Sequence, residues 1–348
     1  MENDKKKRIS GGRILRGFLC GLLVLILAVV LGLTFYAKYL LNKINYVDKE
    51  EESYLSSEEV EQFMESTEPE EINPQYETLA DEDLDWGEDT TPIEDTEETI
   101  NILLIGQDSR SSTGRSLADV MILVTVNKNT KTITMTSIMR DLYVQIPGYE
   151  NSKLNHTYGW GGFDLLNRTL EENFGIQVEG NLEVNFQRFA QLIDLLGGVD
   201  IELRSDEAAW INDAVGYNGL GAGMQHLDGQ QALAYSRIRN LDNDADFSRT
   251  ARQRKVLTSL FNKFRQSDVE TLMKLMEEAL PMLTTDMTQT ELLALAAEVL
   301  PILPECTLVS QRIPADGAYV CATIKGMSVI KADMDAARKL LAETMETE

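Results

Sequence analysis

Apolar positions are distributed in two different ways along the chain. Near the start they form one long run, GFLCGLLVLILAVVLGLTFYA at 17–37, which holds 21 consecutive uncharged residues. As an α-helix rising about 1.5 Å per residue, this run would measure roughly 31 Å, which matches the hydrocarbon core of a bilayer. A cleaved signal peptide would have a shorter apolar region, of about 7–15 residues, closed by small residues at a cleavage site. The pattern therefore predicts an uncleaved transmembrane helix, which we place at 17–41.

From residue 99 onwards, apolar residues recur in short runs that predict strands. INILLIG at 100–106 is typical of a buried strand, and the β-branched stretch 119–138 predicts two strands that turn at Asn127–Thr130. NLEVNF at 181–186 and VDIEL at 199–203 predict two more. The first strands form a hairpin, whereas the later ones are separated by helical patterns.

Segments with helical spacing of apolar residues lie between these strands and after them. WGGFDLLNRTLEENFG at 160–175 and FQRFAQLIDLLGG at 186–198 have apolar residues at helical intervals and end in glycine, which suits a C-cap. Further helices are predicted at 227–235, 246–266, 268–280, 288–300 and 331–345. Because hairpins and crossovers both occur, we expect an α/β domain with a mixed central sheet sandwiched by helices.

The charge of the chain is concentrated in particular segments. The 348 residues include 57 acidic and 32 basic side chains, for a formal net charge of −25. Residues 1–16 hold six basic and two acidic side chains, whereas 42–98 hold 22 acidic and two basic ones. Basic residues before the apolar run place the N-terminus in the cytoplasm and everything beyond Lys38 outside. This pattern excludes a uniformly soluble protein and a generically basic nucleic-acid binder.

These shifts in composition predict five regions. Residues 42–98 have few aromatic residues and no sustained periodicity, so we expect a disordered tether, although such an acidic segment can also bind cations or a basic partner. The regions are a cytoplasmic basic tail at 1–16, the transmembrane helix at 17–41, the acidic disordered tether at 42–98, an extracellular α/β domain at 99–260, and a C-terminal helical and strand extension packed on it at 261–348.

Three cysteines occur in the chain. Cys20 lies in the apolar run, where it serves as a small apolar residue. Cys306 and Cys321 both fall in the part assigned to the oxidising exterior. They either form a disulfide or remain free, because spacing alone does not establish disulfide geometry.

The loop after the first strand contains two carboxylates that are candidates for metal binding. In GQDSRSSTGRSLAD, Asp108 and Asp119 stand at the two ends, with Arg110 and Arg115 between them. Ligands in open α/β sheets bind at strand ends, where two carboxylates would suit Mg²⁺ or Mn²⁺ held together with phosphate oxygens. A solvated polar loop is the alternative.

Arginines are concentrated in ALAYSRIRNLDNDADFSRTARQRKV at 232–256. Arg237 and Arg239 are two residues apart, so they would share a face on a strand. If the next helix begins near Asp246, then Asp246, Arg249 and Gln253 fall on its inward side. Inward arginines need anionic partners, and a pyrophosphate fits two planar guanidinium groups better than internal carboxylates do.

Three neighbouring side chains point in other directions from that helix. For Arg252, Arg254 and Lys255 we expect a solvated surface. Nucleic acid is excluded as the anion bound by the inward arginines, because the predicted topology puts this domain outside the cell.

Five segments together resemble the LytR-CpsA-Psr family of cell-wall glycopolymer ligases. They run in order from about Asn101 to Val256 and read NILLIGQD, SIMRD, KLNHTYGWGG, LLGGVDIEL and GMQHLDGQQALAYSRIRN…DFSRTARQ. The resemblance implies a phosphotransferase on the outer face of the cell membrane. It would move a glycopolymer, such as teichoic acid or capsule, from a polyprenyl-pyrophosphate carrier to a peptidoglycan sugar hydroxyl. A phosphodiester would form and polyprenyl phosphate would be released.

The resemblance also implies roles for individual residues. It assigns metal binding, with Mg²⁺ or Mn²⁺ as cofactor, to Asp108 and Asp119. It assigns pyrophosphate binding to Arg140, Arg237, Arg239 and Arg249, with Asp246 and Gln253 as the remaining polar positions. Arg115 and Gln253 complete the expected pyrophosphate-binding set. At Arg115 the chain departs from the family, which commonly has Arg-Ser-Asp before the second strand, because Arg115 is followed here by Ser-Leu-Ala-Asp.

Several functional alternatives stay open. Asp141 and Asp246 are the candidates for a general base, although Asp141 would also serve merely to orient Arg140. The two histidines, His156 and His226, are too few for a histidine-rich metal site, so we expect structural hydrogen bonds. A non-catalytic membrane-anchored regulator, a polyprenyl-lipid-binding module and a lipid pyrophosphate hydrolase are the rival functions.

Overall fold

A computed structural model describes residues 35–48, 52–66, 72–87, 93, 98–107, 116–242 and 245–346. The chain divides into two units, Met1–Ile44 and Asn45–Glu348. In the first unit residues 35–41 are helical, and most of the predicted transmembrane helix lies outside the described residues. Among the described residues, no helix combines the length and the apolar character that a membrane crossing requires.

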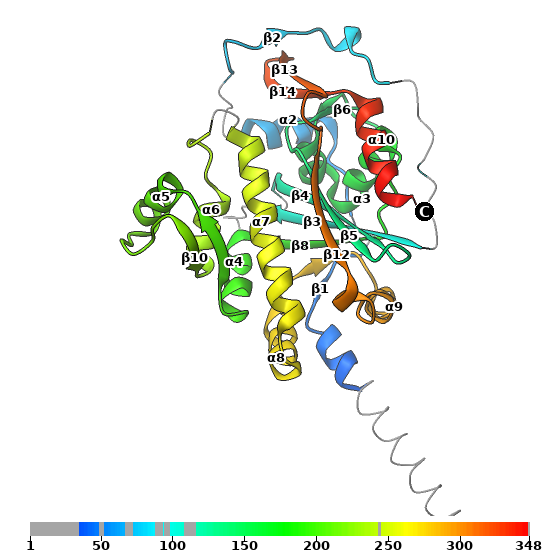
Figure 1. Cartoon of the computed structure of the whole chain (residues 1–348). Helices are drawn as coiled ribbons and strands as arrows, with labels where there is room; N and C mark the ends of the chain where they lie inside the picture. The colour runs from blue at the N-terminus through cyan, green and yellow to red at the C-terminus, as the bar shows by residue number, and fades with distance from the viewer. Residues whose placement is uncertain are drawn as a thin grey trace, which may run out of the picture. The chain divides into compact units, whose positions relative to one another are not determined.

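The second unit is built on a seven-stranded mixed sheet, in agreement with the prediction (Figure 1). β3 pairs antiparallel with β4, and β4 with β5, whereas β8 and β12 run parallel to their neighbours β3 and β5. The predicted turn is confirmed, because Oδ1 of Asn127 accepts hydrogen bonds from the backbone of Asn129 and Thr130. In spatial order the strands are β1 (Asn45–Tyr46), β11 (Thr284–Thr285), β8 (Gly180–Asn185), β3 (Thr99–Gln107), β4 (Ala118–Asn127), β5 (Thr132–Ile138) and β12 (Thr307–Ile313).

One face of the sheet is covered by α3 (Leu154–Phe174) and α10 (Met334–Met345). Alternate residues of β3 and β4, among them Leu103 and Met121, point into this core, as the alternation along a strand requires. α3 departs from helical geometry at Gly161 and Gly162 and ends at Gly175, whose φ of 69° is readily adopted by glycine.

The opposite face is covered by α7 (Ala245–Gln266), whose Phe261 packs on Val124 and Val126. α4 (Phe186–Leu195) contacts β8. Figure 1 shows α7 between the sheet and a smaller part of the unit, which has its own apolar core. That part contains β9 (Val199–Leu203), α5 (Ser205–Val215), β10 (Gly223–Leu227) and α6 (Gly229–Ser236).

The prediction of a disordered tether at 42–98 is wrong for the parts of this segment that the structure describes. α2 (Ser57–Ser66) packs Val60 and Phe63 against the main core, and the backbone of Leu55 donates to the carbonyl of Trp160. β2 (Glu77–Thr78) pairs with β13 (Tyr319–Ile324). Scattered apolar side chains hold these parts against the core. The high average charge of the segment led to the wrong prediction, because it does not reflect these few positions.

The predicted boundary at 260 is also wrong. It falls inside α7, and the region 261–348 supplies β12, which pairs with β5 along seven residues of the central sheet. The same region contributes β13, which pairs with β14 (Met327–Ala332) and connects through it to α10. It also contains α8 (Val269–Ala279) and α9 (Gln289–Val299). These residues are therefore an integral part of the domain.

Cys306 and Cys321 are both free. Cys306 is buried beside Val126 and Ile133 at the start of β12, whereas Cys321 lies on β13, in a separate three-stranded sheet. The described residues therefore contain no disulfide between them, and the free alternative holds.

Candidate functional site

Asp119 lies at an irregularity between β3 and β4. Gly106 pairs with Val120 and Gln107 pairs with Ala118, so Asp119 is an extra residue on its strand. Such a β-bulge turns a side chain away from the regular alternation and is common beside active sites. The carboxylate of Asp119 thereby reaches the guanidinium of Arg140, with Oδ1 and Nη1 2.5 Å apart.

Arg140 follows the end of β5 and lies between two carboxylates. Its Nη1 bonds Asp119, and its Nε lies 3.3 Å from Oδ2 of Asp141. Burial disfavours its charge, but Asp141 and Asp119 outweigh burial and raise the pKa of Arg140. Arg140 is therefore a fixed cation at the end of the sheet.

Lys153 is a site residue that the sequence reasoning missed. It precedes α3, its side chain is 2% exposed, and its Nζ lies 3.1 Å from Oδ1 of Asp141. Burial favours the neutral form of Asp141, but Arg140 and Lys153 outweigh it and lower the pKa of that carboxyl. Lysine is normally exposed, so no periodicity in the sequence marks this position as buried.

Arg239, Asp246 and Arg249 form the second half of the site. Oδ1 of Asp246 lies 3.2 Å from Nη2 of Arg249 and 3.5 Å from Nε of Arg239. Burial and the nearby Arg140 lower the pKa of Arg249 to about 10. Nε of Arg249 and Oδ1 of Asp246 are buried without a hydrogen-bond partner. Because Arg140 and Arg249 repel each other and one buried arginine N–H is left unpaired, the arrangement is suited to an anion.

Arg237 and Gln253 have weaker connections to this cluster. Arg237 caps α6 and its guanidinium carbon lies 4.9 Å from the centre of the Phe186 ring, at the end of β8. The expectation that Arg237 and Arg239 share a face of a strand is wrong, because the chain leaves α6 in a turn at this point. The side chain of Gln253 is half-buried on α7 and makes no hydrogen bond within the described residues.

The structure describes one of the two predicted metal ligands, Asp119. Asp108, Arg110 and Arg115 lie outside the described residues. Asp119 fits a hard cation such as Mg²⁺, because it is a partly exposed carboxylate that uses only Oδ1 toward Arg140. Within the described ranges, no group of three metal-binding side chains occurs.

Two of the arginines expected on a solvated surface are buried. Arg252 and Arg254 are 3% and 9% exposed, whereas Lys255 is exposed as expected. Arg252 places Nε 2.9 Å from Oε1 of Glu207 on α5 and also bonds Asp242. Its Nη1 donates to the carbonyl of Ile238, between the two site arginines 237 and 239. Arg252 therefore holds the turn that carries them.

Removing Arg252 is expected to destabilise the fold because the buried Glu207 would keep only its contacts with Arg204, whose Nη1 lies 3.8 Å from Oε1 of Glu207. We predict that Arg252→Met lowers the free energy of unfolding of the full chain by about 3–5 kcal/mol, measured in urea. The double variant Arg252→Met/Glu207→Leu is expected to recover most of this loss. A single variant as stable as the parent would show that this ion pair does not hold the turn.

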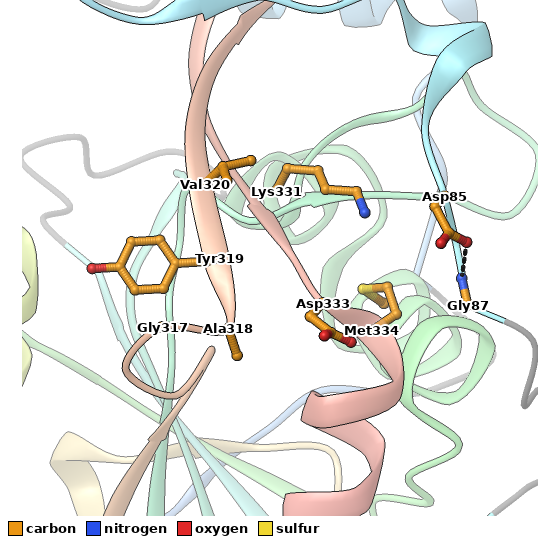
Figure 2. Close-up of a pocket in the computed structure, with 9 residues that line it drawn as sticks. All are labelled: Asp85, Gly87, Gly317, Ala318, Tyr319, Val320, Lys331, Asp333 and Met334. Carbon is orange, nitrogen blue, oxygen red and sulfur yellow. Dashed lines mark hydrogen bonds between the residues drawn. The ribbon is translucent and has the colours of Figure 1, made fainter.

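A separate hollow of about 300 Å³ shares no residue with the arginine cluster (Figure 2). Figure 2 shows Val320 and Lys331 side by side, with the ring of Tyr319 pointing the other way, where it packs on Phe247. The carboxylates of this hollow are engaged by backbone amides, Asp85 by Gly87 and Asp333 by Ala336. It therefore offers no arrangement of reactive groups. Its lining is Asp85, Gly87, Gly317, Ala318, Tyr319, Val320, Lys331, Asp333 and Met334.

Both histidines make structural contacts, as expected. Nδ1 of His156 lies 2.8 Å from Oγ of Ser152, and Nδ1 of His226 lies 2.7 Å from Oδ1 of Asp200. Burial and Lys153 lower the pKa of His156 to about 4, so it stays neutral near pH 7.

Comparison with known proteins finds a family match over most of the chain. The model of the LytR_cpsA_psr family matches residues 47–346. A polyisoprenyl-teichoic acid–peptidoglycan teichoic acid transferase, TagU of Oceanobacillus iheyensis, is 38% identical over 190 residues, which are 53% of this chain and 57% of the relative. TagT of Bacillus subtilis, named for the same activity, is 37% identical over 172 residues, or 48% of this chain and 53% of the relative. The chain thus spans somewhat more than half the length of these relatives.

Solved structures share the fold. TagT bound to LI-WTA is 28% identical, with a TM-score of 0.59, over 71% of this chain and 90% of that chain. The LytR-CPS2A-psr family protein YwtF (TagT) with bound octaprenyl pyrophosphate lipid is 27% identical, with a TM-score of 0.55, over 72% and 91% of the two chains.

Proposed function

The chain belongs to the LytR_cpsA_psr family, and we propose that it is a phosphotransferase acting on a lipid-linked glycopolymer. A peptidoglycan sugar hydroxyl attacks the phosphorus that bears the glycopolymer in a polyprenyl-pyrophosphate donor. The bond between the two phosphates breaks, a phosphodiester forms between glycopolymer and peptidoglycan, and polyprenyl phosphate leaves. We infer these substrates from two kinds of relative. Some are named as teichoic acid transferases, and one solved structure holds octaprenyl pyrophosphate.

The observation that carries this proposal is a pair of neighbouring cations, the partly buried Arg140 after β5 and the buried Arg249 on α7. Arg140 and Arg249 lie close enough for each to affect the other's charge, and Nε of Arg249 has no hydrogen-bond partner. A pyrophosphate diester brings two negative charges, and its cleavage places more charge on the leaving phosphate. Arginines that are positioned before the reaction stabilise that charge without reorganisation. Arg237, Arg239 and Gln253 would extend the same binding surface.

The two candidate bases are not equivalent. Both oxygens of Asp141 are engaged, one by Lys153 and the other by Arg140, so Asp141 positions Arg140. Asp246 is 30% exposed, and its ion pairs with Arg249 and Arg239 both use Oδ1, which leaves Oδ2 for an incoming hydroxyl. We therefore assign the role of accepting the proton of the attacking hydroxyl to Asp246.

We also propose that the reaction depends on Mg²⁺ or Mn²⁺. Asp108 and Asp119 are the residues that would hold it, and Asp119 offers a carboxylate that suits a hard cation. When bound, such an ion would neutralise charge on the phosphate oxygens. The arginines do the rest of the charge stabilisation, and Arg115 would contribute only if its loop brings it to the diphosphate.

The proposed place of action is the outer face of the cell membrane. Six basic residues before the apolar run 17–37 support a single-pass anchor with a cytoplasmic N-terminus. The arginine cluster lies in the part of the chain after this run, so it would meet lipid-linked donors and peptidoglycan outside the cell.

Reconstitution of the full chain tests the proposal. With Mg²⁺ and a polyprenyl-pyrophosphate donor, we expect glycopolymer to become attached to peptidoglycan fragments, and release of polyprenyl phosphate to require those fragments. Release at the same rate without an acceptor would identify a hydrolase. Donor binding without any turnover would identify a non-catalytic lipid-binding protein.

A further inference from the structure

Arg254 is a buried arginine without a carboxylate partner among the described residues. It lies on α7, is 9% exposed, and its Nε donates to Oγ of Ser310 on β12 at 2.7 Å. Its Nη1 is buried and has no hydrogen-bond partner. No ion pair connects it to a carboxylate anywhere in the described part of the chain, whereas the neighbouring Arg252 bonds both Glu207 and Asp242.

Arg254 and Arg249 share a lowered pKa and a buried N–H without a hydrogen-bond partner, but Arg249 also pairs with Asp246. Burial lowers the pKa of Arg254 to about 10, with a further contribution from the neighbouring Arg312. Arg249 also has a pKa lowered to about 10 and an unpaired buried N–H. An unpaired buried cation is costly, and an anionic ligand relieves that cost. Arg254 is 9% exposed, has a buried N–H without a partner and lacks an ion pair among the described residues, which makes it the centre of a candidate anion site.

Arg254 lines a groove of about 600 Å³ along α7. Figure 1 shows α7 with the part containing β10 on one side and β12 on the other, and the groove takes residues from all three. Hydroxyl and amide side chains, including Thr258, Ser259 and Asn262, accompany Arg254 there. The groove also contains Lys255 and Lys263 against Asp200 and Glu202, so with Arg254 its net charge is positive in a strongly acidic chain.

The groove is distinct from the pyrophosphate site. Arg249 and Arg254 are five residues apart on one helix, which separates them by about 7.5 Å along the axis and about 140° around it. One pyrophosphate therefore does not occupy both positions. A guanidinium among hydroxyl and amide groups suits a phosphodiester flanked by sugar or polyol units.

We propose that this groove binds a phosphate of the glycopolymer itself, beyond the pyrophosphate linkage, and that Arg254 supplies the cation for it. The inference rests on the proposed function for the identity of the substrate. Arg254 would thus select donors whose polymer contains phosphate.

Two donors test this selectivity with the full chain. One polyprenyl pyrophosphate carries a phosphate-containing polymer, and the other carries a single sugar without further phosphate. Arg254→Gln is expected to raise KM about tenfold for the first donor, to leave KM for the second unchanged, and to leave kcat unchanged for both. The control Lys274→Gln, an exposed cation on α8, is expected to change neither KM.

Further measurements separate binding from packing. Ser310→Ala removes the hydrogen bond that Arg254 makes within the protein, so an equal rise in KM in this variant would show a packing effect and overturn the proposal. Inorganic phosphate is expected to compete with the polymer donor in the parent and not in Arg254→Gln. Equal KM values for Arg254→Gln and the parent with the polymer donor would also overturn it.

Failure of the proposed function gives a different result. If the parent chain transfers neither donor, the phosphotransferase assignment falls. The groove is then judged by direct binding of the lipid-free phosphate polymer, which is expected to be about tenfold weaker for Arg254→Gln than for the parent. Equal binding by the two chains would overturn the groove site independently of transfer.

Discussion

Replacing Arg249 with glutamine is expected to lower the turnover of glycopolymer transfer about 100- to 1000-fold. This is the usual effect of removing one preorganised donor from a site where negative charge develops. Arg249 is suited to that role because its side chain is 5% exposed and its Nε is unpaired in the protein alone. The measurement is the single-turnover rate of transfer from a lipid-linked donor to peptidoglycan fragments.

The same substitution is expected to leave the fold as stable as the parent or more stable. Burial and Arg140 lower the pKa of Arg249 to about 10, so folding disfavours the charged guanidinium. A neutral side chain removes the cost of burying the charge and the repulsion from Arg140. Replacing a functional residue often stabilises a protein in this way. Thermal unfolding of the full chain checks the point. Destabilisation by several kcal/mol with a proportional loss of transfer would indicate that Arg249 is a structural residue.

Two further variants define the comparison for Arg249. Arg249→Lys keeps the charge but loses the planar donor arrangement, so we expect turnover between those of the parent and the glutamine variant. Lys274→Gln removes an exposed charge on α8 and is expected to leave turnover unchanged. Full transfer by a well-folded Arg249→Gln chain would refute the assigned pyrophosphate site.

Replacing Asp119 with asparagine is expected to weaken metal binding and turnover together. Asn keeps the size of the side chain and loses the negative charge that a hard cation requires. We expect Mg²⁺ binding measured by calorimetry to weaken at least about tenfold and turnover at saturating donor to fall about 100-fold. Asp108→Asn is expected to have the same two effects.

The matched control for the metal prediction is Asp213→Asn, which removes an exposed carboxylate on α5. It is expected to leave both the metal titration and turnover unchanged. A metal titration of Asp119→Asn that superimposes on that of the parent would remove Asp119 from the metal site. Its role would then be limited to holding Arg140.

Local sequence pattern was sufficient for most of the secondary structure. The runs 100–106, 181–186 and 199–203 became β3, β8 and β9, because short runs rich in apolar and β-branched residues are typical of buried strands. The helices that end near Gly175 and begin near Asp246 were likewise predictable from spacing and caps. Average charge was a poor guide at 42–98, since a few apolar anchors suffice to order an acidic segment.

Some residues of the candidate site were predicted from the sequence, and others were found only in the structure. Arg239 and Arg249 were identified in the arginine-rich segment because inward arginines need an anionic partner, whereas the role of Arg140 was implied only by the family resemblance. Asp119 was identified as a carboxylate, but the β-bulge that turns it toward Arg140 depends on the pairing of β3 with β4. Lys153 was missed, because its burial depends on the packing around Asp141.

The sequence by itself determined the elements, the family resemblance and the arginine-rich segment, because these depend on residues that are near one another in the chain. Tertiary structure alone decided which arginines of α7 leave the solvent. Arg252 is buried by Glu207, 45 residues away, and Arg254 by the strand that carries Ser310, 56 residues away. Helical periodicity assigns a direction to each side chain, but only the elements that pack there determine whether that direction leads to water, a carboxylate or a binding groove.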